Sequence, residues 1–294
     1  MTMQPHNATV GEHRYDNVMD AATGLLGEVA GLTNSLDVPF IVMGGWCPYL
    51  RNGLESLPHP GTKDVDLLFK DAATKDGIES VVRTLLAAGF YMSAKHSFQL
   101  LRGLRVRKHT LWFNVDLMHP SDSTQRVEFV DHFEFDIPES QTLQGVIKAK
   151  SIGIPESAYL FDGHWSDHSV SGTLPSGSLF ESTVPLVSPC GLVLSKCRSM
   201  MSPKRPRDAF DVYLMLRQAD AAITVDHLAT LCRRFSSLPD VLAKVCQDMA
   251  DPEVSYVFNA NVKQFCASCL DSDPARFVSE QFNRALGHES GGMS

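Results

Sequence analysis

The chain has 294 residues and a formal net charge of −8, with a calculated pI of about 5.7. This length allows one large domain or two ordinary ones, with a sizeable core. The acidic balance excludes a protein that coats nucleic acid by bulk charge, although it leaves room for a local basic patch.

The cysteine count and the N-terminal segment predict a cytoplasmic protein. Seven cysteines is an odd number and gives no even disulfide framework. The segment "MTMQPHNATVGEHRYD" is polar and lacks the apolar core of a signal peptide. No apolar run reaches the roughly 18 residues that a membrane span needs. We therefore expect no membrane partner.

The first two thirds of the chain predict a mixture of helices and strands. After an expected flexible tail over residues 1–14, apolar residues recur at helical spacing from Tyr15 to about Ser35. The remaining predicted elements are a buried strand at Val38–Met43, a strand from Asp64 to about Lys70, an amphipathic helix with Gly89 as its C-cap, a β-rich stretch up to residue 137, and short strands and loops over 138–189.

After Pro189 the pattern becomes helical and stays so to about Ala285. We therefore expect an α+β protein with an α/β domain over residues 15–188, a C-terminal helical domain over 189–286 and a loose tail over 287–294.

The stretch "GTKDVDLLF" places two acids on one face of a predicted strand. Asp64 and Asp66 are two residues apart, so both point to the same side, while Val65, Leu67 and Phe69 point to the other. Two such carboxylates repel each other unless a cation lies between them. They form a hard oxygen site that suits Mg²⁺ or Mn²⁺.

A third acid, Asp116, lies in the apolar-alternating strand "WFNVDLMH". If this strand pairs beside the first, the three carboxylates converge. Such a group can hold two metal ions about 3.5–4 Å apart, as in-line phosphoryl chemistry requires. Asp116 is then a metal ligand and the best candidate for the general base. Taken alone, each acid also fits a solvated strand edge.

The glycine pair Gly44-Gly45 follows the buried strand and precedes a short helix or turn. Paired glycines let backbone amides approach an anion closely, which suits a phosphate chain. The ordinary alternative is a plain turn from strand to helix.

These motifs together resemble the DNA polymerase β-like nucleotidyltransferase superfamily. The resemblance covers about residues 38–118 and rests on a strand ending in Gly44-Gly45, a T-x-D-x-D strand with Thr62, Asp64 and Asp66, and the later strand with Asp116. It implies a mixed twisted sheet flanked by helices, two divalent metals, and transfer of NMP from an NTP with release of pyrophosphate. It also implies that Gly44, Gly45 and Thr62 bind the nucleotide.

The segment "SKCRSMMSPKRPRDAFDVYLML" resembles the signature of AbiEii-type nucleotidyltransferases, which include toxins of type IV toxin–antitoxin and MenT-like systems. Lys196 lies on an otherwise apolar helical segment and needs an anionic partner, either a triphosphate or Asp211. The resemblance implies that Lys196 and Asp211 belong to the active site. The alternative is a capped helix with surface ion pairs. The arginine spacing departs from the signature, so the arginine that serves the site stays open among Arg198, Arg205 and Arg207.

The predicted function is a Mg²⁺-dependent nucleotidyltransferase that modifies an acceptor hydroxyl. In an AbiEii-like toxin the candidate acceptors are tRNA and protein, and a cognate antitoxin is a candidate partner. "GGW" before a T-x-D-x-D strand also resembles the small nucleotidyltransferases that modify lincosamides or aminoglycosides, which is the first alternative. The second alternative is a non-catalytic nucleotide-binding regulator, and the presence of all three acids argues against it.

The basic hairpin "RGLRVRKH" fits contact with an RNA acceptor and a solvated turn equally well.

Overall fold

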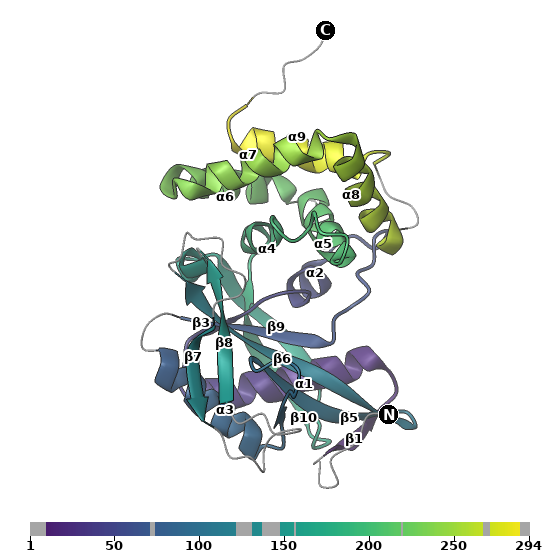
Figure 1. Ribbon diagram of the computed structural model, residues 1–294. Helices are drawn as coiled ribbons and strands as arrows, with labels where there is room; N and C mark the ends of the chain where they lie inside the picture. Colours follow the sequence, from purple (N-terminus) through teal and green to yellow (C-terminus); the bar gives the residue numbers. More distant parts are fainter. Residues whose placement is uncertain are drawn as a thin grey trace. The chain divides into compact units, whose positions relative to one another are not determined.

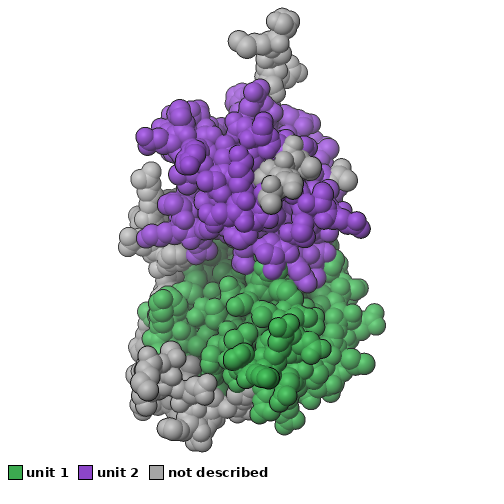
Figure 2. All heavy atoms as spheres, turned by 90° about the vertical axis from the view of Figure 1, so that its right-hand side faces the viewer, with its two compact units in different colours: residues 1–46, 61–187 green, residues 47–60, 188–294 purple. Residues whose placement is uncertain are grey.

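The computed structural model describes residues 10–70, 74–121, 131–136, 148–155, 157–218, 220–266 and 271–288. The chain forms two compact units, one of residues 1–46 and 61–187 and the other of residues 47–60 and 188–294 (Figure 2). Among the described residues, no helix is long and apolar enough to cross a membrane. The six cysteines in this part of the chain are free thiols.

Within the residues that the structure describes, the first unit is built on a mixed sheet of ten strands (Figure 1). Its main path runs β1-β5-β6-β3-β2-β10-β9, with β4 on β5, β8 on β6 and β7 on β8. The strands are β1 (Val10–Tyr15), β2 (Phe40–Val42), β3 (Asp64–Phe69), β4 (Tyr91–Met92), β5 (Gln99–Val106), β6 (His109–Ser121), β7 (Asp131–Asp136), β8 (Lys148–Pro155), β9 (Trp165–Thr173) and β10 (Leu179–Val187). Parallel pairs, among them β3 with β6, alternate with antiparallel ones such as β2 with β3. The predicted α+β class with a mixed sheet is confirmed.

The helical elements that accompany the sheet in the described ranges are α1 (Val18–Asn34), α3 (Thr74–Ala87) and the 3₁₀-helix η2 (Ser157–Phe161). Helix α1 begins where the Asn17 side chain accepts a hydrogen bond from the Asp20 amide, at 2.9 Å. It packs along β9 and β10 and contacts α3. Gly89 has φ +91° just beyond α3, so the predicted C-cap is confirmed.

The expected tail over residues 1–14 differs from the structure at its end. Residues Val10–Tyr15 form strand β1, which pairs in parallel with β5. The reason is Tyr15, whose buried hydroxyl donates a hydrogen bond to the Thr173 carbonyl oxygen at 2.8 Å and so fastens the segment to β9. Residues 1–9 lie outside the described part of the chain.

The basic segment "RGLRVRKH" forms the β5–β6 hairpin, in which Val106 pairs with His109. Arg105 and Arg107 are exposed, and Arg107 adopts φ +53° in the turn. Arg102 is not part of a basic surface, because it is buried and forms an ion pair with Glu28 at 3.2 Å. The hairpin therefore offers fewer exposed cations than its sequence suggests.

The second unit is helical. Helix α2 (Trp46–Arg51) begins at the last residue of the first unit's opening segment, and the other helices are α4 (Pro189–Lys196), α5 (Pro206–Arg217), α6 (Ala221–Arg234), α7 (Ser237–Met249), α8 (Pro252–Phe265) and α9 (Pro274–Ala285). Helix α4 has Ser188 as its N-cap, followed by Pro189 in the first turn, where a missing N–H costs nothing. Helix α5 packs against α4 and α8. The sequence assigns residues 47–60 to the α/β domain, whereas the structure groups them with these helices. The tail beyond residue 288 lies outside the described residues.

Candidate active site

Strands β3 and β6 bring the predicted acids onto one face of the sheet. The two strands are parallel, with Asp66 opposite Asp116 and Asp64 opposite Asn114. Register partners in neighbouring strands point to the same side. Val65 and Leu67, which point to the other side, are fully buried. The alternation predicted for this strand is therefore present, and its apolar face fixes the backbone that carries the acids.

Amide side chains hold two of the three carboxylates. Asn114 donates from Nδ2 to Asp64 Oδ1 at 3.1 Å, and Gln99 donates from Nε2 to Asp116 Oδ1 at 2.9 Å. Gln99 lies opposite Asp116 on β5, so these amides belong to the same sheet face as the acids. Both hydrogen bonds fix the orientation of the carboxylate that accepts them.

At Gly44 the backbone passes close to the Asp66 carboxylate on this face. Gly44 has φ +70°, a conformation that strongly favours glycine. A Cβ atom added there would lie 1.9 Å from Asp66 Oδ2. Asp66 also accepts a hydrogen bond at its backbone oxygen from the Met43 amide, at 2.8 Å. The glycine is therefore required by the approach of the Asp66 carboxylate, a reason that the sequence alone does not reveal.

We expect Gly44→Ala to lower both stability and transfer activity. The left-handed conformation costs a residue with a Cβ about 1–2 kcal/mol. Displacing a reacting group by about 1 Å can reduce a rate about 10²-fold. Urea unfolding and pyrophosphate release measure the two effects. The matched control is Gly31→Ala in α1, where an added Cβ meets nothing within 4 Å. There the same change should stabilise the helix by about 0.5–1 kcal/mol. Equal behaviour of the two variants would contradict the role given to Gly44.

The other residues predicted to bind the nucleotide in this unit lie close to the acids along the backbone. Thr62 is buried, and its hydroxyl oxygen accepts from the Asp64 amide at 3.4 Å. Gly45 is buried beside Gly44. Trp46 is fully buried, and its indole Nε1 donates to the Asp64 carbonyl oxygen at 2.9 Å. The glycine segment and the first acid are thus joined directly.

The carboxylate oxygens on this face suit a divalent cation, although they do not surround one position completely. Within the described ranges, no three His, Cys, Asp or Glu side chains are gathered as a metal-binding group. The predicted convergence of three carboxylates is therefore only partial: Asp66 and Asp116 oppose each other, and Asp64 is turned to Asn114. All three offer carboxylate oxygens, which are the ligands that Mg²⁺ and Mn²⁺ prefer. The missing side chain of Gly44 leaves the space that the Asp66 carboxylate occupies.

A second charged group, in the helical unit, surrounds Lys196. Its Nζ atom donates to Asp208 Oδ1 at 2.7 Å and to Asp211 Oδ2. His59 Nε2 lies 3.0 Å from Asp211 Oδ1. The predicted pairing of Lys196 with Asp211 is present, and both side chains are buried. In this structure the anionic partners of Lys196 are carboxylates of its own chain.

Burial and charge act in opposite directions on this group. Burial alone would lower the pKa of Lys196, but the carboxylates of Asp211 and Asp208 and their hydrogen bonds raise it above its usual value. Burial would raise the pKa of Asp211, but the Lys196 ammonium and the hydrogen bond with His59 hold it below its usual range. Both groups are therefore charged at neutral pH.

Sequence reasoning missed three partners of the predicted site residues. His59, in the loop "ESLPHPGT", contacts Asp211, which is 152 positions away along the chain. Asn114 and Gln99 orient Asp64 and Asp116. Only Asn114 carried a usable signal, because it lies two residues before Asp116 and so shares its face. Among the arginines that the sequence left open, Arg205 lies 3.9 Å from Asp208.

Comparison with protein families places this chain in a known group. The model of a family described as nucleotidyl transferase AbiEii toxin, type IV toxin–antitoxin system, matches residues 56–287. The chain belongs to the AbiEii family. It is therefore a nucleotidyltransferase of a toxin family. No curated protein matches it at a significant level.

The range matched to AbiEii contains the acids of both units but not the whole candidate site. Asp64, Asp66 and Asp116 fall within it, as do Lys196 and Asp211. The glycine pair at 44–45 lies before its start. Gly44 is linked to the acids by its close approach to the Asp66 carboxylate, and the segment that follows it by the hydrogen bond from Trp46 to the Asp64 carbonyl oxygen.

Proposed function

We propose that this AbiEii-family chain transfers a nucleoside monophosphate from an NTP to an acceptor hydroxyl, with release of pyrophosphate. The observation that supports the proposal best is the register of β3 and β6, which sets Asp66 opposite Asp116. A nucleotidyl transfer needs carboxylates on one face that can hold cations and accept a proton.

Asp64, Asp66 and Asp116 would hold the divalent cation, Mg²⁺ or Mn²⁺. When bound, the cation offsets the negative charge of the phosphates and lowers the pKa of a coordinated hydroxyl. Asp116 would accept the proton of the acceptor hydroxyl, with Gln99 keeping its carboxylate in orientation. Asn114 would do the same for Asp64. Gly44, Gly45 and Thr62 would offer backbone and hydroxyl groups to the nucleotide.

We also propose Lys196 and Asp211, in the second unit, as active-site residues, as the AbiEii resemblance implies. Lys196 donates to two carboxylates, so we give it a narrower role than the sequence suggests. It would hold Asp211 ionised and in position for the nucleotide, instead of serving as an isolated cation for the triphosphate. His59 supports the same carboxylate from the other side.

Membership of a type IV toxin–antitoxin family supports three further proposals. The acceptor would be a macromolecule, tRNA or protein, rather than an antibiotic. A cognate antitoxin would oppose the activity. The enzyme would act in the cytoplasm, where tRNA and newly made protein are found.

The proposal is tested by incubating the full chain with each α-³²P-labelled NTP and Mg²⁺. The acceptors are total tRNA, total cell protein, and a panel of aminoglycosides and lincosamides. We expect label in tRNA or protein, with pyrophosphate released in equal amount. Label in the small molecules alone would contradict the toxin assignment. Nucleotide binding without transfer to any acceptor would indicate the regulator instead.

A matched pair of variants tests whether the reaction takes place at the acid face, the sheet face that carries Asp64, Asp66 and Asp116. Asp64→Asn should lose label transfer, while Glu181→Gln, an exposed change on β10, should retain it. Urea unfolding shows that both variants are folded. Transfer that persists in Asp64→Asn would remove this residue from the metal site.

A further inference from the structure

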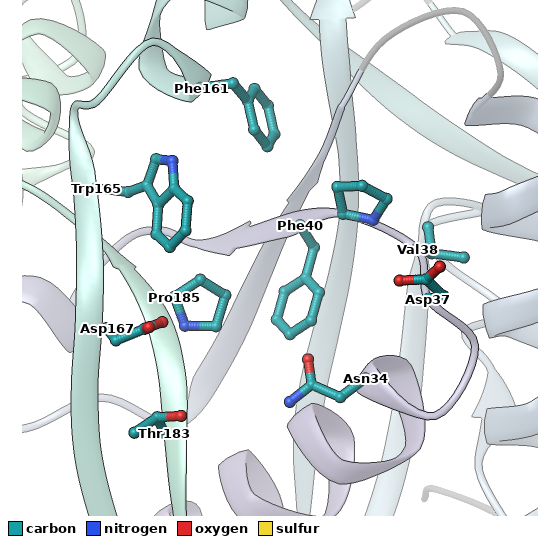
Figure 3. Close-up of a pocket in the computed structure, with 10 residues that line it drawn as sticks. Asn34, Asp37, Val38, Phe40, Phe161, Trp165, Asp167, Thr183 and Pro185 are labelled. Carbon is teal, nitrogen blue, oxygen red and sulfur yellow. The ribbon is translucent and has the colours of Figure 1, made fainter.

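A cavity of about 290 Å³ lies in the first unit, away from the residues of the acid face. Its lining comes from the end of α1, the loop into β2, η2, and strands β9 and β10 (Figure 3). None of the residues assigned to nucleotide transfer lines it. It therefore requires an explanation of its own.

Strands β9 and β10 build one wall of this cavity. Trp165 and Asp167 are two residues apart on β9, so both project from the same face. Asp167 lies opposite Pro185 on β10, which also lines the cavity. Figure 3 shows the Trp165 ring and the Asp167 carboxylate on one side of the Phe40 ring.

The opposite wall is the turn between α1 and β2. In this turn the Leu36 amide donates a hydrogen bond to the Thr33 carbonyl oxygen at 3.1 Å, and the next residue, Asp37, adopts φ +51°. Figure 3 shows Asp37 across the cavity from Asp167, with the Asn34 amide below Phe40. Two carboxylates thus approach the same space from separate elements.

The chemistry of the lining favours a positive group. Its charged members are Asp37 and Asp167, and no Lys, Arg or His is among the lining residues. Within the described part of the chain, neither carboxylate takes part in an ion pair. A triphosphate would be repelled here, so this is not a second nucleotide site.

The aromatic rings point to an organic cation rather than a metal ion. Trp165 is 36% exposed, although tryptophan side chains are highly buried on average. The other residues of its strand are mostly small or polar. Phe161 lines the same cavity. The face of a tryptophan ring attracts ammonium and guanidinium groups, and nearby carboxylates add to that attraction.

We propose that this cavity binds an organic cation, a guanidinium or alkylammonium group. Its volume of about 290 Å³ lies just below the range of ligand pockets, which span about 300–1,000 Å³. It therefore suits one extended side chain or a small polyamine. The two sources share the same chemistry: an arginine or lysine side chain of a partner protein, or a free polyamine.

Binding is tested by calorimetric titration of the full chain with N-acetyl-arginine amide and with its neutral isostere, N-acetyl-citrulline amide. We expect the arginine probe to bind about tenfold more tightly, because only it carries the charge. Titration with spermidine forms the second arm. Tighter binding of spermidine identifies a polyamine site, and tighter binding of the arginine probe a site for a protein side chain.

Variants locate the binding in the cavity. Asp37→Asn combined with Asp167→Asn should weaken the preferred cation about tenfold, and Trp165→Leu should weaken it severalfold. Glu181→Gln removes an exposed carboxylate from the same sheet and should change nothing. All these positions except Trp165 are well exposed, and urea unfolding checks each fold. Equal binding of the citrulline probe, or unchanged binding by the double variant, would overturn the proposal. Neither result depends on whether nucleotide transfer occurs.

Discussion

Asp116→Asn should abolish nucleotide transfer while the protein stays folded. The substitution keeps the shape of the side chain but removes the negative charge and the ability to accept a proton. Loss of a general base typically lowers a rate about 10²–10⁴-fold. Asp116 is half-buried and its strand is fixed by Val115 and Leu117, both fully buried, so the backbone should not move. The measurement is initial-rate pyrophosphate release at saturating NTP.

A variant of Gln99 distinguishes the role of the base from the role of the residue that orients it. Gln99→Leu removes the hydrogen bond to Asp116 but leaves the carboxylate in place. Residues that orient a ligand usually matter about 10–100-fold. We therefore expect a smaller loss than in Asp116→Asn, with a changed pH dependence of the rate. If Asp116→Asn retained most of the native rate, Asp116 would not be the base, whatever the effect of Gln99→Leu.

The sheet could be predicted from the sequence because its signals are local. The alternation around Asp64 and Asp66, and the glycine after α3, are set by neighbours along the chain. Strand pairing is different. That β3 lies beside β6 was expected from the family resemblance alone. The register that sets Asp66 opposite Asp116 depends on contacts between residues 50 positions apart and was not predicted.

The contacts of the helical unit show the same limit more clearly. Lys196 on an apolar helix indicated an anionic partner, but the sequence left that partner open between a triphosphate and Asp211. No pattern in the loop "ESLPHPGT" marks His59 as the second partner of Asp211. Residues 47–60 join the helical unit through such long-range contacts, which a reading by local periodicity does not detect.

Lys196→Met should give the largest loss of stability of any change proposed for the second unit. Methionine keeps the length and packing of the lysine stem but removes the ammonium. Asp208 and Asp211 are then left as two buried carboxylates without their shared cation. Breaking a buried ion pair from one side typically costs about 3–5 kcal/mol. Urea unfolding at neutral pH, read as the change in free energy of unfolding, measures the effect.

The matched control is Lys244→Met in α7. Lys244 also pairs with an aspartate, Asp248 at 2.5 Å, but its side chain is 62% exposed. Exposed pairs of this kind contribute about 0.3–0.5 kcal/mol. A loss in Lys196→Met no larger than in Lys244→Met would contradict the view that burial makes this group important.

The dependence of stability on pH identifies charge as the cause. The pKa of Lys196 is raised on folding, so its contribution is complete below its unfolded pKa of about 10.4 and is lost as pH rises through the higher folded value. The pKa of Asp211 is lowered, so its contribution is present above about 3.9 and is lost as pH falls through the folded value. The native protein should therefore exceed Lys196→Met most between these limits. Adding Asp211→Asn to Lys196→Met removes one stranded carboxylate, so the double variant should lose less than the sum of the single losses. Strict additivity would show that the two side chains act separately, and the proposed support of Asp211 by Lys196 would then fail.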